Sequence, residues 1–268
     1  MTPLSLDEVL ALLGTLGELG ERVVLIGGQA VSFWADHYIR LGRAPEISSD
    51  APLTSKDIDF CGPRDVVPLF ARRLRGGRAR LATLDDATPN VGVIRYLDDS
   101  GNERVIDFLG APFGMTAVEV QRDAVPVALR TREGIATGHH VLLMHPVACL
   151  ESRVHNVVGL AHTYDTPHGR RQLRAATVFA REALKDVLAT PAAEHFDPVR
   201  TALDLNERLF HLCHANAHGR VVLQRTGIDP FDAVLVDPRL GEKFIGRRLP
   251  QMRERLARLR GKLPGPGR

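Results

Sequence analysis

The chain has 268 residues, of which 44% are hydrophobic and 25% charged, and its formal net charge is +3. These values are typical of an ordinary globular protein and suffice for one large domain or two modest ones. No apolar run reaches the roughly 18 residues of a membrane span and the N-terminus lacks a signal-peptide pattern, so we expect a cytoplasmic protein without a membrane partner. Three scattered cysteines argue against a disulfide framework and against a zinc knuckle: Cys61, Cys149 and Cys213.

The first 41 residues predict a helix, a strand and a second helix. Leucines at helical intervals, behind a serine and a glutamate at capping-box spacing, predict a helix over residues 5–18. The apolar run RVVLIGG predicts a short buried strand, and QAVSFWADHYIRL predicts the second helix. We expect four side chains of this helix to face the core: Ala30, Phe33, Trp34 and Tyr38.

The next hundred residues contain mostly strand patterns. After a loop over residues 42–55, KDIDFCG predicts a strand and PRDVVPLFARRLRGG a helix that begins at a proline. VGVIRYLD and ERVIDFLG alternate apolar and polar residues around a loop that contains glycine, which predicts a hairpin. VPVALRT and HHVLLMH add two short extended segments.

From about residue 145 the hydrophobic pattern changes to a helical period. It predicts helices at 145–160, 168–188, 193–217 and 240–262. These patterns therefore predict an α/β half followed by an α-helical half.

Two aspartates alternate with apolar residues in the segment SKDIDF. The two-residue period of a strand puts Asp57 and Asp59 on one face, and Ile58 and Phe60 on the other. Like charges so close repel each other unless a cation neutralises them, and carboxylate oxygens are hard ligands that suit Mg²⁺. A solvated strand end is the alternative role of this pair.

Asp107 is the candidate for a third carboxylate. It lies between Ile106 and Phe108, so its strand shows the same alternation of polar and apolar faces. If this strand pairs beside the strand of Asp57 and Asp59, the three aspartates converge at one edge of the sheet. Such a site holds two Mg²⁺ about 4 Å apart, which stabilise the attacking and leaving oxygens of an in-line displacement at phosphorus.

Gly27 and Gly28 lie between a predicted strand and a predicted helix. Free backbone N–H groups and the positive end of the helix dipole attract a triphosphate there, and the missing Cβ atoms permit its close approach. Lys56 is a candidate to counter the carboxylates or a phosphate, and facing water is its alternative role. Three further residues are candidates to line the pocket: Gln29, Thr54 and Ser55.

The strand, the glycine pair, the helix, the DxD pair and the later carboxylate together resemble the nucleotidyltransferase superfamily with the DNA polymerase β-like fold. More narrowly, LIGGQAVSFWA, TSKDIDF and HPVACLESRVHNV look like the AbiEii-type branch, the nucleotidyltransferase toxins of type IV toxin–antitoxin systems and their relatives. The resemblance covers roughly residues 22–110, and the helix at 145–160 adds weaker support. It implies an α+β fold, with a mixed-sheet nucleotidyltransferase catalytic domain over residues 1–140 followed by a helical C-terminal domain over 141–268.

The resemblance also implies an activity, the Mg²⁺-dependent transfer of a nucleoside monophosphate from an NTP to an acceptor hydroxyl, with release of pyrophosphate. Asp57 and Asp59 match the metal-binding pair. Asp107 matches the third carboxylate, which binds metal and helps to activate the acceptor. Gly27 and Gly28 match the phosphate-binding turn.

The substrate side of the site is less defined by the sequence. Arg153, on the predicted helix 145–160, is a candidate triphosphate ligand, and an exposed ion pair is its alternative role. Residues 239–268 contain ten Lys or Arg against Glu242 and Glu254. Together with the resemblance, this basic segment favours RNA such as tRNA as the acceptor, and a cognate antitoxin as a partner. A solvated basic helix, a protein acceptor and a small-molecule acceptor such as an aminoglycoside stay open.

Two other functions fit parts of the sequence. A non-catalytic nucleotidyltransferase-fold binding module or antitoxin-type partner is the main alternative. Three uncompensated carboxylates argue against it, because a site without activity gains nothing from them. His211, His214 and His218 are expected on one helical face, where imidazoles at this spacing can bind zinc or nickel. Packing and surface roles are the favoured interpretation of these histidines.

Overall fold

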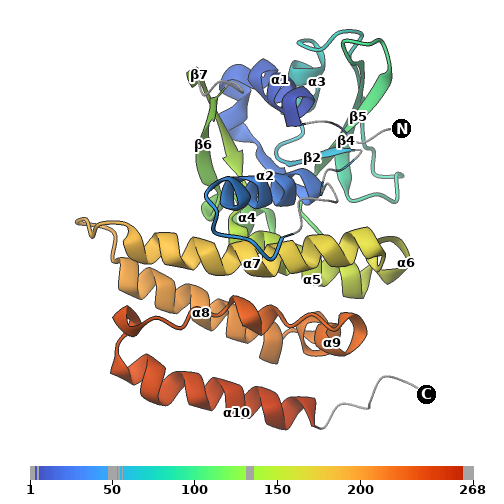
Figure 1. The fold of residues 1–268 in the computed structure, drawn as a ribbon. Helices are drawn as coiled ribbons and strands as arrows, with labels where there is room; N and C mark the ends of the chain where they lie inside the picture. The colour runs from blue at the N-terminus through green and yellow to red at the C-terminus, as the bar shows by residue number, and fades with distance from the viewer. Residues whose placement is uncertain are drawn as a thin grey trace. The chain divides into compact units, whose positions relative to one another are not determined.

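The structure is a computed structural model of the chain, and it describes residues 4, 6–47, 53, 55, 57–130 and 136–261, without the side chains of residues 137 and 139. The chain divides into two compact units. Residues 1–33 and 51–149 form one, which we name the sheet unit, and residues 34–50 and 150–268 form the other, the helical unit. A mixed sheet accompanied by helices confirms the predicted α+β class (Figure 1).

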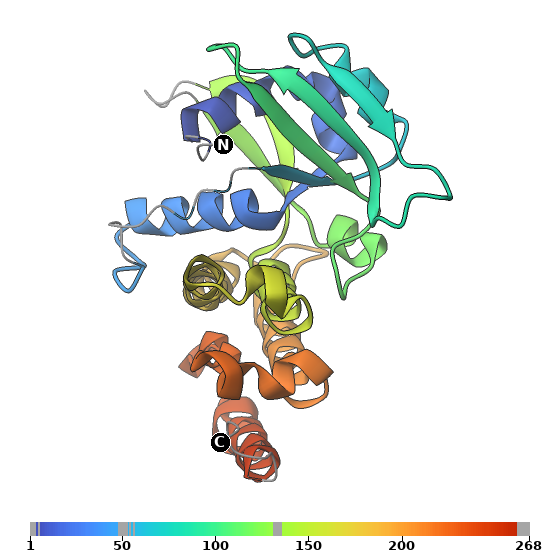
Figure 2. The same cartoon turned by 90° about the vertical axis from the view of Figure 1, so that its right-hand side faces the viewer.

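The sheet unit contains a mixed seven-stranded sheet in the described part of the chain, with the strand order β3-β4-β5-β2-β1-β7-β6. Its strands are β1 Val24–Ile26, β2 Ile58–Cys61, β3 Arg78–Leu81, β4 Asn90–Leu97, β5 Glu103–Leu109, β6 Val125–Arg130 and β7 Ala136–Leu143. β1 is antiparallel to β2 and parallel to β7, and β2 is parallel to β5. The predicted hairpin is confirmed, because β4 and β5 pair in antiparallel fashion. The twisted strands can be followed in Figure 2.

One face of β2 and β5 is fully apolar. Ile58, Phe60, Ile106 and Phe108 have no exposed surface, and the rings of Phe60 and Phe108 lie 5.4 Å apart. The ring of Phe70 covers this pair edge-on from helix α3 (Val66–Ala71). Burial of each such side chain contributes about 1.5–3 kcal/mol, so this face fixes both strands and leaves their other face for polar residues.

The sheet unit also contains α1 (Leu6–Leu16), the start of α2 (Gly27–Arg40), and α4 (Ala117–Arg122), which begins with a complete capping box. The predicted first two helices are thereby confirmed. In α2, Ala30, Trp34 and Tyr38 are buried as expected, whereas Phe33 is only half-buried.

The helical unit follows the helical period of the sequence. Its elements are most of α5 (Pro146–Gly159), α6 (Ala161–Tyr164), α7 (Pro167–Ala189), α8 (Pro198–His214), α9 (Ala217–Thr226), a π-helical turn (Lys243–Arg248) and α10 (Leu249–Arg260). Within this unit α8 packs between α7 and α10 (Figure 1). The predicted helix over 193–217 ends early, because Asn216 accepts hydrogen bonds from the backbone of His218 and Gly219 and thus begins α9.

All three cysteines are free and buried. Burial raises the pKa of Cys61, in β2, to about 11, and it also raises the pKa of Cys213, in α8. None of the helices in the described residues has the length and apolar character needed to cross a membrane.

Candidate active site

Asp59 and Asp107 lie opposite each other on neighbouring strands. β2 and β5 run parallel, with Asp59 paired to Asp107 and Phe60 paired to Phe108. Side chains at paired positions of parallel strands project from the same face of a sheet. The strand of Asp107 therefore does pair beside the strand of Asp59, and the two carboxylates are neighbours on the polar face.

The first glycine of the pair lies directly against the Asp59 carboxylate. Gly27 begins α2 with a φ of +68°, and a Cβ added there would lie 2.1 Å from Asp59 Oδ2. The register of β1 and β2 explains this approach, because Ile26 pairs with Asp59. Both the backbone conformation and the space exclude a side chain at residue 27. The Asp59 carboxylate thus already requires this glycine, and phosphate binding at the turn stays a prediction.

Asp57 and Asp107 influence each other electrostatically. Asp57 is exposed just before β2, whereas Asp107 is half-buried and accepts a hydrogen bond of 2.7 Å from Asn90 Nδ2 at its Oδ1. Burial raises the pKa of Asp107, the negative charge of Asp57 raises it further, and the bond from Asn90 lowers it. Asp107, the third predicted carboxylate, therefore lies within the electrostatic field of Asp57.

The donor chemistry of this face suits a hard divalent cation. Within the described residues, no Lys, Arg or His forms an ion pair with Asp57 or Asp107. In the same residues, no group of three or more His, Cys, Asp or Glu side chains converges closely enough to form a ready metal site. Ionised carboxylates without a cation repel each other, which disfavours such convergence. Their oxygens are the ligands that Mg²⁺ prefers, so the residues fit this ion.

Asn90 is a site residue that the sequence analysis missed. It begins β4, and the register with β5 shifts between Asn90 and Gly92, which marks a β-bulge. Bulges redirect side chains and are common beside active sites. A glycine two positions into an otherwise alternating strand is a sequence signal for such a bulge, and Gly92 is one.

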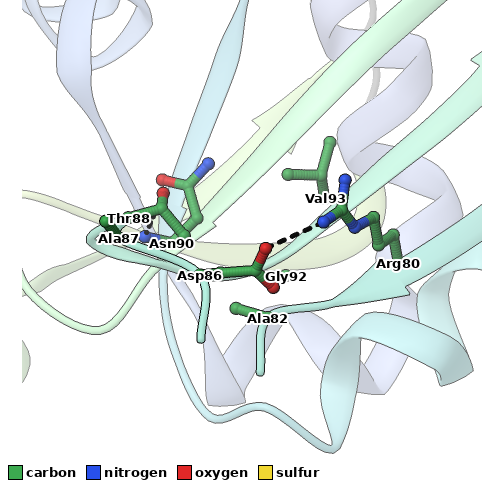
Figure 3. A pocket seen from close by; sticks show the side chains of 8 residues that line it. All are labelled: Arg80, Ala82, Asp86, Ala87, Thr88, Asn90, Gly92 and Val93. Carbon is green, nitrogen blue, oxygen red and sulfur yellow. Dashed lines mark hydrogen bonds and ion pairs between the residues drawn. The ribbon is translucent and has the colours of Figure 1, made fainter. Parts of the chain in front are cut away.

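A pocket of about 320 Å³ adjoins Asn90 in the sheet unit (Figure 3). The side chains of Thr88 and Asn90 lie together on one side, and Arg80 reaches Asp86 on the other, with a distance of 2.8 Å between Arg80 Nη2 and Asp86 Oδ1. Asp86 also accepts bonds from the backbone and hydroxyl of Thr83, which fix the loop between β3 and β4. Asn90, which lines this pocket, is also the residue that donates to Asp107.

Of the other residues predicted for the NTP site in the sheet unit, the structure describes Gln29, Gly28 and Ser55. Gln29 is buried, and its Nε2 donates a 3.0 Å hydrogen bond to the carbonyl oxygen of Ser55, just ahead of Asp57. Gly28 is also buried and accepts a bond from the hydroxyl of Ser32. Lys56 and Thr54 lie outside the described residues.

Arg153 lies on α5, in the part that belongs to the helical unit. Its side chain is buried rather than exposed, which removes the alternative of an exposed ion pair. Its Nη1 donates a 3.0 Å hydrogen bond to Gln172 Oε1, and its guanidinium lies 6.0 Å from the ring centre of Tyr164. A role as triphosphate ligand stays a prediction.

The predicted histidine face is wrong. His211 and His214 lie on α8, but His218 lies on α9, since Asn216 begins a new helix between them. His218 Nδ1 instead lies 2.9 Å from His155 Nδ1, and the ring of His214 stacks on Phe210. These contacts support packing roles, and the described residues contain no three-ligand histidine site.

The basic C-terminal segment is partly neutralised within the helical unit. Four of its arginines form ion pairs with acidic residues: Arg239, Arg248, Arg258 and Arg260. Four other basic residues are exposed and have no acidic partner among the described residues: Lys243, Arg247, Arg253 and Arg255. Positive charge is therefore available to solvent along the π-helical turn and α10.

Comparison with known proteins gives little beyond this geometry. No model of a protein family matches the chain, and no curated protein matches it. The crystal structure of an antigenic nucleotidyltransferase-like protein from Paracoccidioides brasiliensis is similar over 77% of this chain and 91% of that chain, with 13% identity and a TM-score of 0.42. At this identity and TM-score the likeness carries no information about function.

Proposed function

We propose that the protein is an Mg²⁺-dependent nucleotidyltransferase that transfers a nucleoside monophosphate from an NTP to an acceptor hydroxyl. The observation that supports it most is the in-register pair of Asp59 and Asp107, with Gly27 at the start of a helix directly against the Asp59 carboxylate. A strand-to-helix turn beside paired carboxylates brings an anion-binding helix end and hard oxygen ligands together.

Asp57, Asp59 and Asp107 are the proposed ligands of Mg²⁺. When held by these carboxylates, Mg²⁺ would supply neutralisation of charge on the phosphates and on the leaving pyrophosphate. The backbone N–H groups at the start of α2 bind the triphosphate, because they have no partner within the helix. This part of the site therefore binds and orients the NTP.

The acceptor side of the reaction depends on Asp107. The acceptor oxygen forms a bond to the α-phosphorus, the bond from that phosphorus to the β-phosphate oxygen breaks, and pyrophosphate leaves. The hydroxyl proton moves to the Asp107 carboxylate. Burial raises the pKa of this carboxyl group, which makes it a stronger base than an exposed aspartate.

RNA is the acceptor that we propose. The exposed basic residues of the π-helical turn and α10 support it, because unpaired Lys and Arg side chains bind a phosphate backbone. A toxin role with a cognate antitoxin belongs to the same proposal, and its test is growth arrest on expression of the wild type but not of the Asp57→Ala, Asp59→Ala variant.

The test of the activity is label transfer. The protein is incubated with Mg²⁺, total cellular RNA and each α-labelled NTP in turn, beside the Asp57→Ala, Asp59→Ala variant. A matched control, Asp99→Ala with Asp204→Ala, removes two exposed carboxylates that are not among the proposed ligands. We expect label on RNA with the wild type and the control only.

Two outcomes contradict the proposal. If no NTP labels RNA, protein or small molecules, the chain is not a transferase of this kind. If RNA binds equally to the wild type and to the double variant while no label is transferred, the chain is a binding module instead.

A further inference from the structure

Asn90 belongs to two features at once. Its Nδ2 donates the 2.7 Å hydrogen bond to Asp107 Oδ1, and the same side chain forms part of the wall of the 320 Å³ pocket (Figure 3). The backbone N–H of Asn90 donates to Thr88 Oγ1 at 3.2 Å, so the loop before β4 holds Asn90 in place. Anything that fills the pocket against Asn90 therefore lies beside the partner of Asp107.

The β-bulge explains why Asn90 can reach Asp107. In the unshifted part of the ladder Val93 pairs with Asp107 and Ile94 with Ile106, whereas beyond the shift Asn90 pairs with Leu109. The extra residue in β4 changes the direction of the strand at this point. Asn90 holds one oxygen of the Asp107 carboxylate and leaves the other oxygen for a proton.

The chemistry of the pocket wall selects a particular kind of group. Arg80 supplies guanidinium donors, Asp86 and Thr88 supply acceptors, and Asn90 supplies a carbonyl oxygen that no described residue uses. The wall contains no aromatic side chain on which a base could stack, and small residues such as Ala87 leave the space open. Closely spaced donors and acceptors suit vicinal hydroxyls, which both donate and accept.

We propose that this pocket is the acceptor subsite of Asp107, that it takes a sugar ring with neighbouring hydroxyls, and that Asn90 is the positioning residue that joins the pocket to Asp107. The sugar is the terminal ribose of an RNA. This inference rests on the proposed transferase function. A hydroxyl of the ribose forms the bond to the α-phosphorus, its proton passes to the Asp107 oxygen that Asn90 leaves free, and pyrophosphate departs.

The pocket is tested by filling it. Ala87→Trp adds bulk inside the pocket, and Leu84→Trp adds it to a fully exposed residue of the same loop that does not line the pocket. We expect Ala87→Trp to raise the KM for RNA about tenfold or more, while calorimetry with NTP and Mg²⁺ gives an affinity within about twofold of the wild type. Leu84→Trp changes neither value.

The sugar is tested by periodate oxidation, which destroys the vicinal diol at the RNA terminus. Oxidised RNA is expected to accept no label from the wild type. Equal labelling of intact and oxidised RNA, or label confined to protein, overturns the ribose as occupant. Unchanged KM in a folded Ala87→Trp variant overturns the pocket as acceptor subsite.

Asn90 is tested with Asn90→Ala and Asn90→Asp. Loss of positioning is expected to lower kcat about 10- to 100-fold at an unchanged NTP affinity, and Asn90→Asp is the more severe because it adds a like charge beside Asp107. The matched control is Asn102→Ala, which removes another Asn–Asp hydrogen bond of the same hairpin, to Asp98. Equal loss in Asn90→Ala and Asn102→Ala overturns the positioning role.

The outcomes separate this inference from the function on which it rests. Without any transfer by the wild type, the transferase and its acceptor subsite both fail. With transfer by the wild type and no response to Ala87→Trp or Asn90→Ala, only the subsite and the positioning role fail. Circular dichroism of each variant establishes that it is folded.

Discussion

Two carboxylates, one in each unit, have very different surroundings. Glu182 on α7 is 2% exposed, and its oxygens lie 3.1 Å from Arg43 Nε, 2.5 Å from Lys185 Nζ and 3.7 Å from Arg181 Nε. Asp107 on β5 is half-buried, and within the described residues only the neutral amide of Asn90 bonds to its carboxylate. One carboxylate is surrounded by cations, and the other faces further negative charge from Asp57.

The difference separates a structural carboxylate from one that serves a ligand. A buried charge is tolerated when opposite charges and hydrogen bonds satisfy it, as they do for Glu182. A chain that leaves Asp107 without a cation keeps a stability cost that folding does not require. Partly buried charges without a compensating partner concentrate at functional sites. The polar face of β2 and β5 therefore indicates a site for an external cation.

The largest expected effect belongs to Asp107→Asn. The replacement keeps the shape of the side chain and its bond from Asn90, but it removes the base and a metal ligand. We expect label transfer to RNA to fall at least about 1,000-fold, as for other groups of this kind. The control is Asp99→Asn, on an exposed loop residue. Full activity of Asp107→Asn contradicts the proposed role.

Asp107→Asn is expected to raise stability at pH 7, although it lowers activity. The pKa of Asp107 is raised above its ordinary value of 3.8, so the folded state disfavours the ionised form. This cost is present above the raised pKa and disappears as the pH falls toward 3.8. We therefore expect Asp107→Asn to unfold at a higher urea concentration than the wild type at pH 7, without this advantage below pH 3.8. A less stable variant at pH 7 contradicts the comparison.

Glu182→Gln is expected to affect stability rather than activity. It leaves Arg181 and Lys185 without their buried partner and weakens the pairing of Arg43, which keeps Asp186. The three cations left behind are 31–43% exposed and stay hydrated, so the loss is that of charge-assisted hydrogen bonds, about 1.5–3 kcal/mol. Urea unfolding measures the loss, with the exposed Glu194→Gln as control. A stable Glu182→Gln variant would remove the contrast between the two carboxylates.

Gly27→Ala is expected to lower both stability and transfer. A left-handed conformation costs a residue with a Cβ about 1–2 kcal/mol. Gly42→Ala is a matched control, because Gly42 has a φ of +66° and nothing within 4 Å of an added Cβ. Gly42→Ala is expected to lose only this conformational cost, whereas Gly27→Ala is expected to lose more stability and, because its Cβ displaces the Asp59 carboxylate, transfer as well. Equal transfer by both variants contradicts the role of this contact.

Local sequence patterns predicted much of the carboxylate face. The two-residue period placed Asp59 and Asp107 on polar strand faces, and the hairpin pattern predicted the pairing of β4 with β5. The order of the sheet was beyond these patterns, because β1 pairs with β2 and β7 across long stretches of chain. Such pairings depend on tertiary contacts that no local period contains.

The errors and omissions have local causes. Asn90 reaches Asp107 through a bulge, which breaks the period on which the strand prediction relied. His218 left the predicted face because Asn216 offered its side chain as a cap, and a cap outweighed continuation of the helix. At Gly27 the sequence analysis omitted the contact with the Asp59 carboxylate, and phosphate binding at this turn stays a prediction.

The buried thiols make each unit separately observable. Cys61 belongs to the sheet unit and Cys213 to the helical unit, and neither thiol is exposed in the folded chain. A buried thiol with a raised pKa reacts with an alkylating reagent only when its surroundings open. The modification rate of each cysteine, followed by peptide mass spectrometry, therefore reports the rate at which its unit opens. Equal rates mean that the chain opens as a whole, and unequal rates identify the unit that opens first.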